Sequence, residues 1–413
     1  MILLFLTSGL FLGWSLGAND ASNVFGSAVG SKMVSFRKAA IIASIFVILG
    51  AVIQGAGASD TLGKLGGVNA IGGSFTLALA AAITIYVMTK FSLPVSTTQA
   101  IVGAIIGWNL FTGNSTDAST LSKIVATWIS GPILGAIFAI LLYILIIRFK
   151  RATKIHLVRF ESYIKTGLIV VGAFGAYSLG ANNIANVMGV FVPAFNLQDL
   201  DLRLFTLSSN QQLFLIGGLA IAVGIITYSK KVMETIGGNI VELTSEGAMV
   251  VVLAQSLVLF IFSSSGLSNL FVKIGLPPIP MVPVSSSQVI VGCVIGIGLY
   301  KGARNINFKI LGEIAIGWLS TPIMSGLLAY FSLFFMKNIF NINVGHKISG
   351  PGSETMIPAG QITGGADMSG IVKYLLLGIM VFGIIAIIYY YLLERKKTRE
   401  LRKSEERFWK NLK

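Results

Sequence analysis

The stretch GANDASNVFG at residues 17–26 places asparagine and aspartate directly after an apolar segment, and a near copy, GANNIANVMG, returns at 180–189. The two copies, called here the asparagine motifs, agree at six of ten positions. Residues 2–16 and 163–179, which lead into them, are largely apolar. The sequence therefore predicts two membrane helices that each carry polar side chains to the depth of the hydrocarbon.

A second pair of repeats follows the first pair in the same order. PVSTTQAIVGAIIG at 94–107 and PVSSSQVIVGCVIG at 283–296, called here the PVS motifs, agree at nine of fourteen positions. WISGP at 128–132 likewise matches WLSTP at 318–322. Three related motifs in one order in both halves indicate an internal duplication.

The composition is that of a membrane protein. Of the 413 residues, 54% are hydrophobic and 11% are charged, with a mean hydropathy of +0.82, whereas soluble domains carry about a quarter charged residues. Apolar stretches of about twenty residues recur, and the alternating segments of a β-barrel are absent. We expect an all-α polytopic protein of the cell membrane with about eleven or twelve membrane segments. The candidate spans are 2–30, 39–58, 72–90, 94–112, 123–147, 163–194, 211–228, 246–263, 284–300, 308–336 and 370–393.

The basic residues fix the expected topology. The net charge of +15 comes mainly from short loops and the C-terminal tail, which indicates the positive-inside bias and not nucleic-acid binding. An outside N-terminus and a cytoplasmic C-terminus bring these clusters to the cytoplasm. Five crossings per half then make the halves two inverted-topology repeats with discontinuous helices. The expected parts are 1–147 (first repeat), 148–162 (basic cytoplasmic linker), 163–336 (second repeat), 337–369 (polar glycine-rich loop) and 370–413 (final span and tail).

The PVS motifs have the composition of an anion site. Pro94 and Pro283 interrupt a helix, and hydroxyl and amide side chains follow at the start of the next one. Such residues also cap ordinary helices, but two matched copies favour a site in which helix starts face an anion. Lys90, four residues before the first motif, leaves open whether the motifs lie in re-entrant hairpins or in broken spans. The expected anion-binding residues are Thr97, Thr98, Gln99, Ser286, Ser287 and Gln288.

The asparagine motifs have the composition of a cation site. Amide oxygens, unwound backbone carbonyls and a carboxylate are hard ligands for a small cation, and Asp20 is the one carboxylate in the four motifs. Since the motifs contain no lysine or arginine, co-bound cations must balance the charge of an anion. Glu313, in an apolar span, is either an interfacial residue or a further cation or proton site. The expected cation ligands are Asn19, Asp20, Asn23, Asn182, Asn183, Asn186, Ser96 and Ser285.

The asparagine and PVS motifs together resemble the duplicated signature of the inorganic phosphate transporter (PiT) family, over residues 1 to about 335. The resemblance implies secondary transport of inorganic phosphate, coupled to sodium in some members and to protons in others. It also implies an inverted-repeat fold with the substrate between the halves. Sulfate-transporting relatives exist in the family, so the anion is less firmly implied than the class of protein.

The resemblance thus implies a phosphate importer driven by sodium, with sodium ions as coupling ions at the expected cation ligands, phosphate at the expected anion-binding residues and no resident cofactor. A proton-coupled phosphate or metal-phosphate symporter and a sulfate permease of the same fold are the alternatives. An anion channel fits less well, because inverted halves with broken helices suit alternating access. Enzyme motifs such as His-Glu-x-x-His are absent. Whether the chain forms a homodimer stays open.

Overall fold

The computed structural model describes residues 2–90, 95–153, 155–195, 197–201, 206–236, 244–302 and 308–346. Pro94, most of the predicted loop 337–369 and the predicted span 370–393 with its tail lie outside the described residues.

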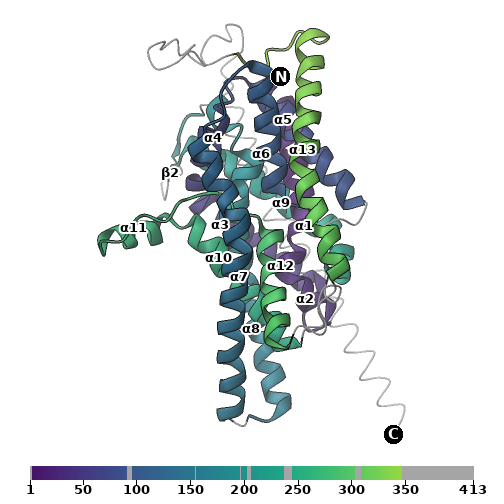
Figure 1. Cartoon of the computed structure of the whole chain (residues 1–413), viewed down its shortest axis with the longest axis vertical. Coiled ribbons are helices and arrows are strands. Elements are labelled where there is room, and N and C mark those ends of the chain that lie inside the picture. The colour runs from purple at the N-terminus through teal and green to yellow at the C-terminus, as the bar shows by residue number, and fades with distance from the viewer. Residues whose placement is uncertain are drawn as a thin grey trace. The chain divides into compact units, whose positions relative to one another are not determined.

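The described chain is helical almost throughout (Figure 1). The first half contains α1 (Ile2–Asp20), α2 (Ser22–Gly30), α3 (Phe36–Gln54), α4 (Ala56–Gly66), α5 (Ile71–Lys90), α6 (Thr97–Thr112) and α7 (Ala118–Thr153). The second half contains α8 (Leu157–Met188), η1 (Val192–Ala194), β1 (Leu200–Asp201), β2 (Thr206–Leu207), α9 (Ser209–Ile236), α10 (Ser245–Ser263), α11 (Ser265–Lys273), α12 (Ser286–Tyr300) and α13 (Phe308–Asn338). The two short strands pair antiparallel.

Seven helices within the described residues are long and apolar enough to cross a membrane: α3, α5, α7, α8, α9, α10 and α13. On α7, large apolar side chains recur every fourth residue along one exposed face. They are Ile129, Ile133, Ile137, Leu141 and Leu145, each between 45% and 66% exposed. A continuous apolar stripe on the outside of a helix is suited to lipid, so the prediction of an all-α, multi-pass membrane protein is confirmed.

The duplication is visible in how the helices pack. The glycine of each asparagine motif touches the backbone of a helix from the other half. A Cβ at Gly17 of α1 would lie 2.0 Å from the Ile221 carbonyl oxygen of α9, and one at Gly180 of α8 would lie 2.1 Å from the Val47 carbonyl oxygen of α3. Both glycines therefore allow the close approach of two helix backbones.

The PVS motifs are packed by the same rule. A Cβ at Gly103 of α6 would lie 2.2 Å from the Pro322 carbonyl oxygen of α13, and one at Gly292 of α12 would lie 2.1 Å from the Pro132 carbonyl oxygen of α7. These prolines belong to the WLSTP and WISGP repeats. Each half thus packs chiefly on its counterpart, in the reciprocal pairs α1 with α9, α3 with α8, α6 with α13 and α12 with α7.

Helix α1 runs parallel to α9, because Gly13 lies against Gly217 and Gly17 lies against Ile221 farther along both helices. Helix α3 runs antiparallel to α9. There the Ser44 hydroxyl reaches the Ala222 carbonyl, while the later residue Ile48 packs on the earlier residue Gly218.

Helix α3 runs parallel to α8, since Gly180 lies on Val47 and the later residue Ile184 lies on Gly55. Taken together, these directions make α1 and α8 antiparallel. That is the relationship which two inverted repeats require of matching helices.

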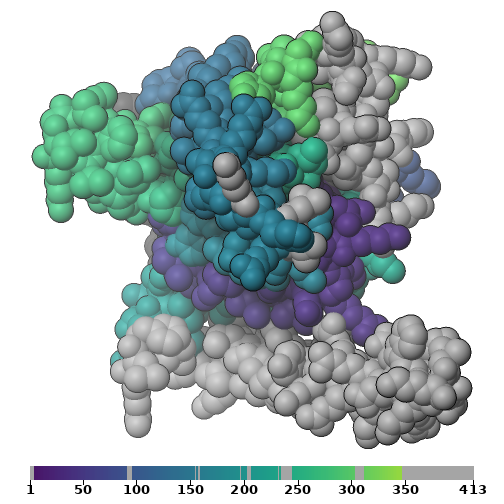
Figure 2. Space-filling view, turned by 90° about the horizontal axis from the view of Figure 1, so that it is seen from below, coloured from purple at the N-terminus to yellow at the C-terminus, as the bar shows by residue number. Residues whose placement is uncertain are grey.

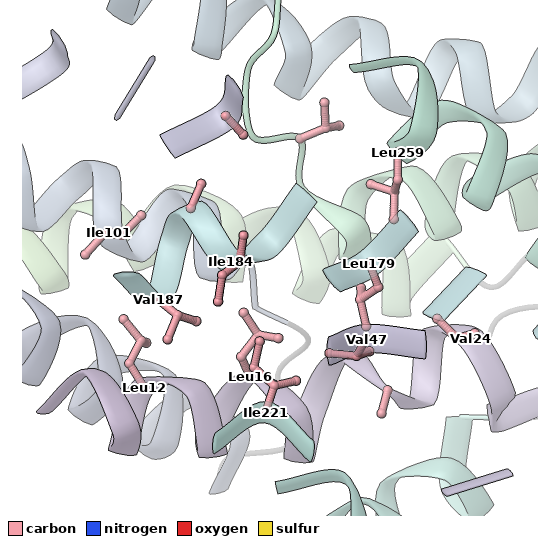
Figure 3. Packing of buried hydrophobic residues seen from close by; sticks show 14 of the residues in the cluster. Leu12, Leu16, Val24, Val47, Ile101, Leu179, Ile184, Val187, Ile221 and Leu259 are labelled. Atoms are coloured by element: carbon pink, nitrogen blue, oxygen red, sulfur yellow. The ribbon is translucent and has the colours of Figure 1, made fainter. Parts of the chain in front are cut away.

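The buried hydrophobic core surrounds the asparagine motifs (Figure 3). Leu16 of α1 lies close to Ile221 of α9, whereas Leu12 of α1 lies nearer to Val187 of α8, and Ile184 of α8 is on the side of Leu16 away from Ile221. All five side chains are buried. The polar residues of the motifs are therefore enclosed by apolar packing and have little access to bulk water.

Helices extend into the residues that connect the two halves. Within 148–162, α7 continues to Thr153 and α8 begins at Leu157, because long helices extend beyond the apolar region. The second half also carries an insertion between α10 and α12 that contains α11. This helix stands out from the neighbouring helices in two perpendicular views (Figures 1 and 2).

Candidate functional site

The asparagine motifs lie in helices and are not unwound, contrary to the expectation from their glycines. Helix α8 runs without a break through Gly180 and Asn183 to Met188. Between α1 and α2 only Ala21 interrupts the helix, and its φ of −61° and ψ of −26° are still helical. The glycines serve close packing, so the motifs offer side-chain oxygens and amides where free backbone carbonyls were predicted.

The PVS motifs do break the chain. Helix α6 begins at Thr97, and the Ser96 hydroxyl accepts a hydrogen bond from the Gln99 N–H at 3.2 Å. Helix α12 begins at Ser286, and the Ser285 hydroxyl accepts one from the Gln288 N–H at 3.3 Å. Ser96 and Ser285, predicted as cation ligands, are therefore N-caps, and each hydroxyl keeps a further lone pair. The remaining N–H groups of both first turns point out of the helix start.

Each PVS motif connects two helices that run in opposite directions. The Trp108 indole of α6 lies beside Gly73 near the start of α5, so α6 returns toward the end at which α5 begins. Helix α12 returns toward the start of α10 in the same manner. The Tyr300 ring at the end of α12 packs on Tyr143 of α7. About two turns farther along α7, Lys150 forms an ion pair with Glu246 in the first turn of α10, so the end of α12 and the start of α10 lie at the same end of α7. Each PVS motif is thus the turn of a helical hairpin, formed by α5 and α6 in the first half and by α10 and α12 in the second.

Asp20 is the one buried carboxylate in the described part of the chain, with 1% of its surface exposed. Its Oδ1 accepts a hydrogen bond from the Asn19 amide at 3.0 Å. Its Oδ2 accepts from the Asn183 amide at 3.1 Å and from the Ser286 hydroxyl at 2.9 Å. Asp20 thus joins both asparagine motifs to the second PVS motif.

The second asparagine motif makes the remaining contacts to the hairpins. The Asn182 side chain accepts from the Val284 N–H at 2.9 Å and donates to the Val284 carbonyl at 2.7 Å. The Asn186 amide donates to the Thr98 hydroxyl at 2.9 Å and to the Asn183 side-chain oxygen at 3.3 Å. Asn182 and Asn186, about one turn apart on α8, therefore bind the second and the first PVS motif respectively.

The two PVS motifs also touch each other, because the Ser287 hydroxyl donates to the Val95 carbonyl at 2.7 Å. Several polar atoms in this cluster are buried and have no protein partner among the described residues. They are Asn23 Nδ2, Thr97 Oγ1, Gln99 Oε1, Asn186 Oδ1 and Gln288 Oε1. Buried polar atoms are nearly always hydrogen-bonded in native proteins, so these five atoms, all on residues of the four motifs, indicate positions for polar ligands.

Hydrogen bonds join Asn19, Asp20, Asn183, Asn186, Thr98 and Ser286 into one cluster. Every residue that the four motifs predicted is buried. Glu313 is not among them, because it lies on the exposed surface of α13. No sequence pattern marks the backbone groups of Val95 and Val284, because their roles as hydrogen-bond partners depend on how the hairpins fold back. The described residues contain no group of three His, Cys, Asp or Glu that could hold a metal ion. Amide, hydroxyl and single-carboxylate oxygens instead suit a hard, weakly bound cation.

The alignments between this chain and similar proteins cover nearly the whole length of those proteins. A protein from Thermococcus kodakarensis named as a candidate phosphate permease is 26% identical over 405 residues, which covers 80% of this chain and 96% of the relative. A similarly named protein from Pyrococcus horikoshii is 27% identical over 403 residues, with coverage of 79% and 96%. One from Haemophilus influenzae is 25% identical, with coverage of 81% and 96%.

A solved structure has the same fold. It is described as the sodium-dependent phosphate transporter, and it superimposes with a TM-score of 0.65 at 23% sequence identity, covering 82% of this chain and 99% of that one. The model of the phosphate transporter family matches residues 16–329, which include all four motifs and both helical hairpins. This chain therefore belongs to the phosphate transporter family, a family of membrane transport proteins and not of enzymes.

Proposed function

We propose that this protein imports inorganic phosphate together with sodium ions, by alternating access at the cluster formed by the asparagine and PVS motifs. The observation that carries the proposal is the position of Asp20. A single buried carboxylate, bridged to both asparagine motifs and to the second PVS motif, is costly in a membrane unless a cation balances it. A bound cation would in turn balance the charge of an anion held nearby.

The anion would lie between the two helix starts. Thr98 accepts a hydrogen bond from Asn186, so its own hydroxyl proton is available to an oxyanion. The Thr97 hydroxyl has no partner among the described residues. The first N–H groups of α6 and α12 add further donors, with the favourable ends of two helix dipoles. Hydroxyl and backbone donors of this kind hold tetrahedral oxyanions without a basic side chain.

The paired glutamines give a reason for selecting phosphate over sulfate. The Oε1 atoms of Gln99 and Gln288 are buried acceptors for which the described part of the chain supplies no donor. Phosphate at neutral pH carries a proton that can be donated to such an acceptor, whereas sulfate carries none. A site with an acceptor that only one ligand can satisfy discriminates strongly, because the other ligand leaves the acceptor unpaired.

The antiparallel directions of α1 and α8 support alternating access. Matching hairpins that enter from opposite ends and meet at the same depth allow one site to face either side when the halves rock. The topology that goes with this proposal has the start of α1 outside and the connection between α7 and α8 in the cytoplasm. The basic residues near that connection, among them Lys150 and Arg151, satisfy the positive-inside bias.

The test is uptake of radiolabelled phosphate into proteoliposomes with the sodium and pH gradients imposed separately. A sodium gradient at equal pH should drive accumulation, and unlabelled sulfate should compete poorly. Accumulation driven only by a pH gradient would replace sodium with protons, for which the buried Asp20 carboxyl is the natural carrier. Equal competition by sulfate would make the protein a general oxyanion permease, and downhill flux without coupling would make it a channel.

A further inference from the structure

A pocket of about 300 Å³ lies between α4 and the end of α8, outside the buried cluster. Helix α4 contributes its polar face, and the other wall comes from the chain that follows α8. The lining residues are Ser59, Asp60, Gly63, Lys64, Gly189, Val192 and Pro193. Its volume exceeds that of a phosphate ion with several water molecules, since one water occupies about 30 Å³ of liquid.

The pocket is close to the cluster along the chain of α8. Gly189, in its wall, follows Asn186 by three residues, which corresponds to about 4.5 Å of rise along a helix. Asn186 contacts Thr98 and carries a buried side-chain oxygen without a partner. Gly55, at the junction of α3 and α4, packs on Ile184 in the same turn of α8. The pocket wall at Gly189 is therefore about one helical turn along the chain from Asn186.

The pocket carries one charge of each sign. Asp60 and Lys64 are four residues apart and lie on one face of α4, and both are exposed. The ion pair found in the described residues joins Lys150 to Glu246 and does not involve either of them. A symporter must collect ions of opposite sign, and the motifs in the cluster offer no basic side chain to attract an anion.

We infer that this pocket is the outer access vestibule of the transport pathway, in which Lys64 attracts phosphate and Asp60 attracts the coupling cation before both enter the cluster. The inference rests on the proposed function. It assigns the vestibule to the outer side because α8 is antiparallel to α1 and therefore ends where α1 begins. Charged groups at the mouth of a narrow site raise the local concentration of ions of opposite sign.

Gly63 provides a direct test, since a Cβ at this position meets nothing within 4 Å. In a Gly63→Cys variant, a membrane-impermeant, positively charged thiol reagent applied from outside should react and reduce phosphate uptake by at least about half. Saturating phosphate with sodium should slow the reaction. Cys293 is the only cysteine of the wild-type chain and is buried, so the wild type measures background. The matched control is Ser115→Cys, an exposed residue in the α6–α7 connection that does not line the pocket, where modification should leave uptake unchanged.

The charge of Lys64 is tested separately. Lys64→Gln should raise the half-saturating phosphate concentration by about threefold or more at low ionic strength with little change in maximal rate, and choline chloride at constant sodium should reduce the difference. Lys64→Arg should restore the wild-type value, and Lys123→Gln, an exposed charge in the first turns of α7, should change little. Modification of Gly63→Cys without effect on uptake, or reaction only from the cytoplasmic side, would overturn the vestibule while phosphate transport by the wild type still stood. An unchanged half-saturating phosphate concentration in Lys64→Gln would show that Lys64 does not attract phosphate.

Discussion

Asn182 on α8 binds both peptide groups of a single residue, Val284: its Oδ1 accepts from the Val284 N–H at 2.9 Å, and its Nδ2 donates to the Val284 carbonyl at 2.7 Å. The asparagine side chain thus takes the place of a neighbouring β-strand for a segment that belongs to no helix or sheet. This pairing fastens the connection before α12 to the helix that carries Asn183 and Asn186. It explains how an extended peptide can be buried inside a membrane protein with its polar groups satisfied.

Asn182→Asp should weaken this attachment, because a carboxylate oxygen would then face the Val284 carbonyl where a donor is needed. One lost bond that leaves a buried acceptor unpaired costs about 1–3 kcal/mol, and the melting temperature in detergent should fall accordingly. Asn338→Asp is the control, since Asn338 is exposed and its amide also donates to a carbonyl, that of Phe334. Equal melting temperatures for the two variants would show that the Asn182 pairing adds no stability.

Asp20→Asn should abolish or strongly weaken the dependence of phosphate uptake on sodium, because it removes the one buried carboxylate. The measurement is uptake against sodium concentration at fixed phosphate. Asn183→Asp in the same background is the informative partner. Asn183 donates to Asp20, so a carboxylate moved to position 183 stays in the same cluster and should restore part of the sodium dependence. Normal sodium dependence in Asp20→Asn would show that the first asparagine motif has a structural role and does not bind the coupling cation.

Thr98→Ala should raise the half-saturating phosphate concentration by about ten- to a hundredfold, since a hydrogen bond to a charged ligand is worth about 1.5–3 kcal/mol. Ser287→Ala should raise it less, because the Ser287 hydroxyl already donates to the Val95 carbonyl. The second variant should instead lower the melting temperature. Uptake kinetics and thermal melting of both variants separate these effects. If neither variant alters phosphate dependence, the PVS motifs serve only as helix caps.

Gly180→Ala should destabilise the protein, because the added methyl group would lie 2.1 Å from the Val47 carbonyl oxygen and would force α3 and α8 apart. Overpacking of this kind costs about 1–3 kcal/mol. Gly312→Ala is the opposite case, since a Cβ at Gly312 would meet nothing within 4 Å. Replacing this glycine by alanine in a helix should raise the free energy of unfolding by about 0.5–1 kcal/mol. Melting temperatures that move together would refute the packing role of Gly180.

The topology can be read from thiol labelling. Cysteines at Ser35, before α3, and at Lys301, after α12, should react with an impermeant reagent only from the cytoplasmic side, whereas a cysteine at Ser115 should react only from outside. Right-side-out and inverted vesicles give the two measurements. Reaction of Ser35→Cys and Lys301→Cys from opposite sides would contradict the inverted arrangement of the two halves.

Much of the site could be predicted from the sequence because the duplication marks it. Repeated polar residues such as Asn183 and Ser286 stand out in apolar surroundings, where an unsatisfied polar group is expensive and is retained for a reason. Chemical type could also be predicted, since donors at helix starts suit an anion and carboxylate or amide oxygens suit a cation. The predicted role of Glu313 had weaker support, because no repeat marks that residue, and in the structure it is exposed.

The tertiary structure decided what the motifs do to the backbone. A glycine in a membrane segment can break a helix or let two helices touch, and the sequence is the same in both cases. At Gly17 and Gly180 the partner backbones of α9 and α3 lie too close for any side chain, so the helices stay regular and their asparagine side chains supply the ligands. The sequence by itself determined the membrane class, the duplication and the polar residues of the site. These features depend on composition and on repeated short motifs, which do not require knowledge of long-range contacts. Only tertiary packing decided that Asp20 meets Asn183 and Ser286. These partners follow Asp20 in the sequence by 163 and by 266 positions, so the contacts depend on how the two halves dock.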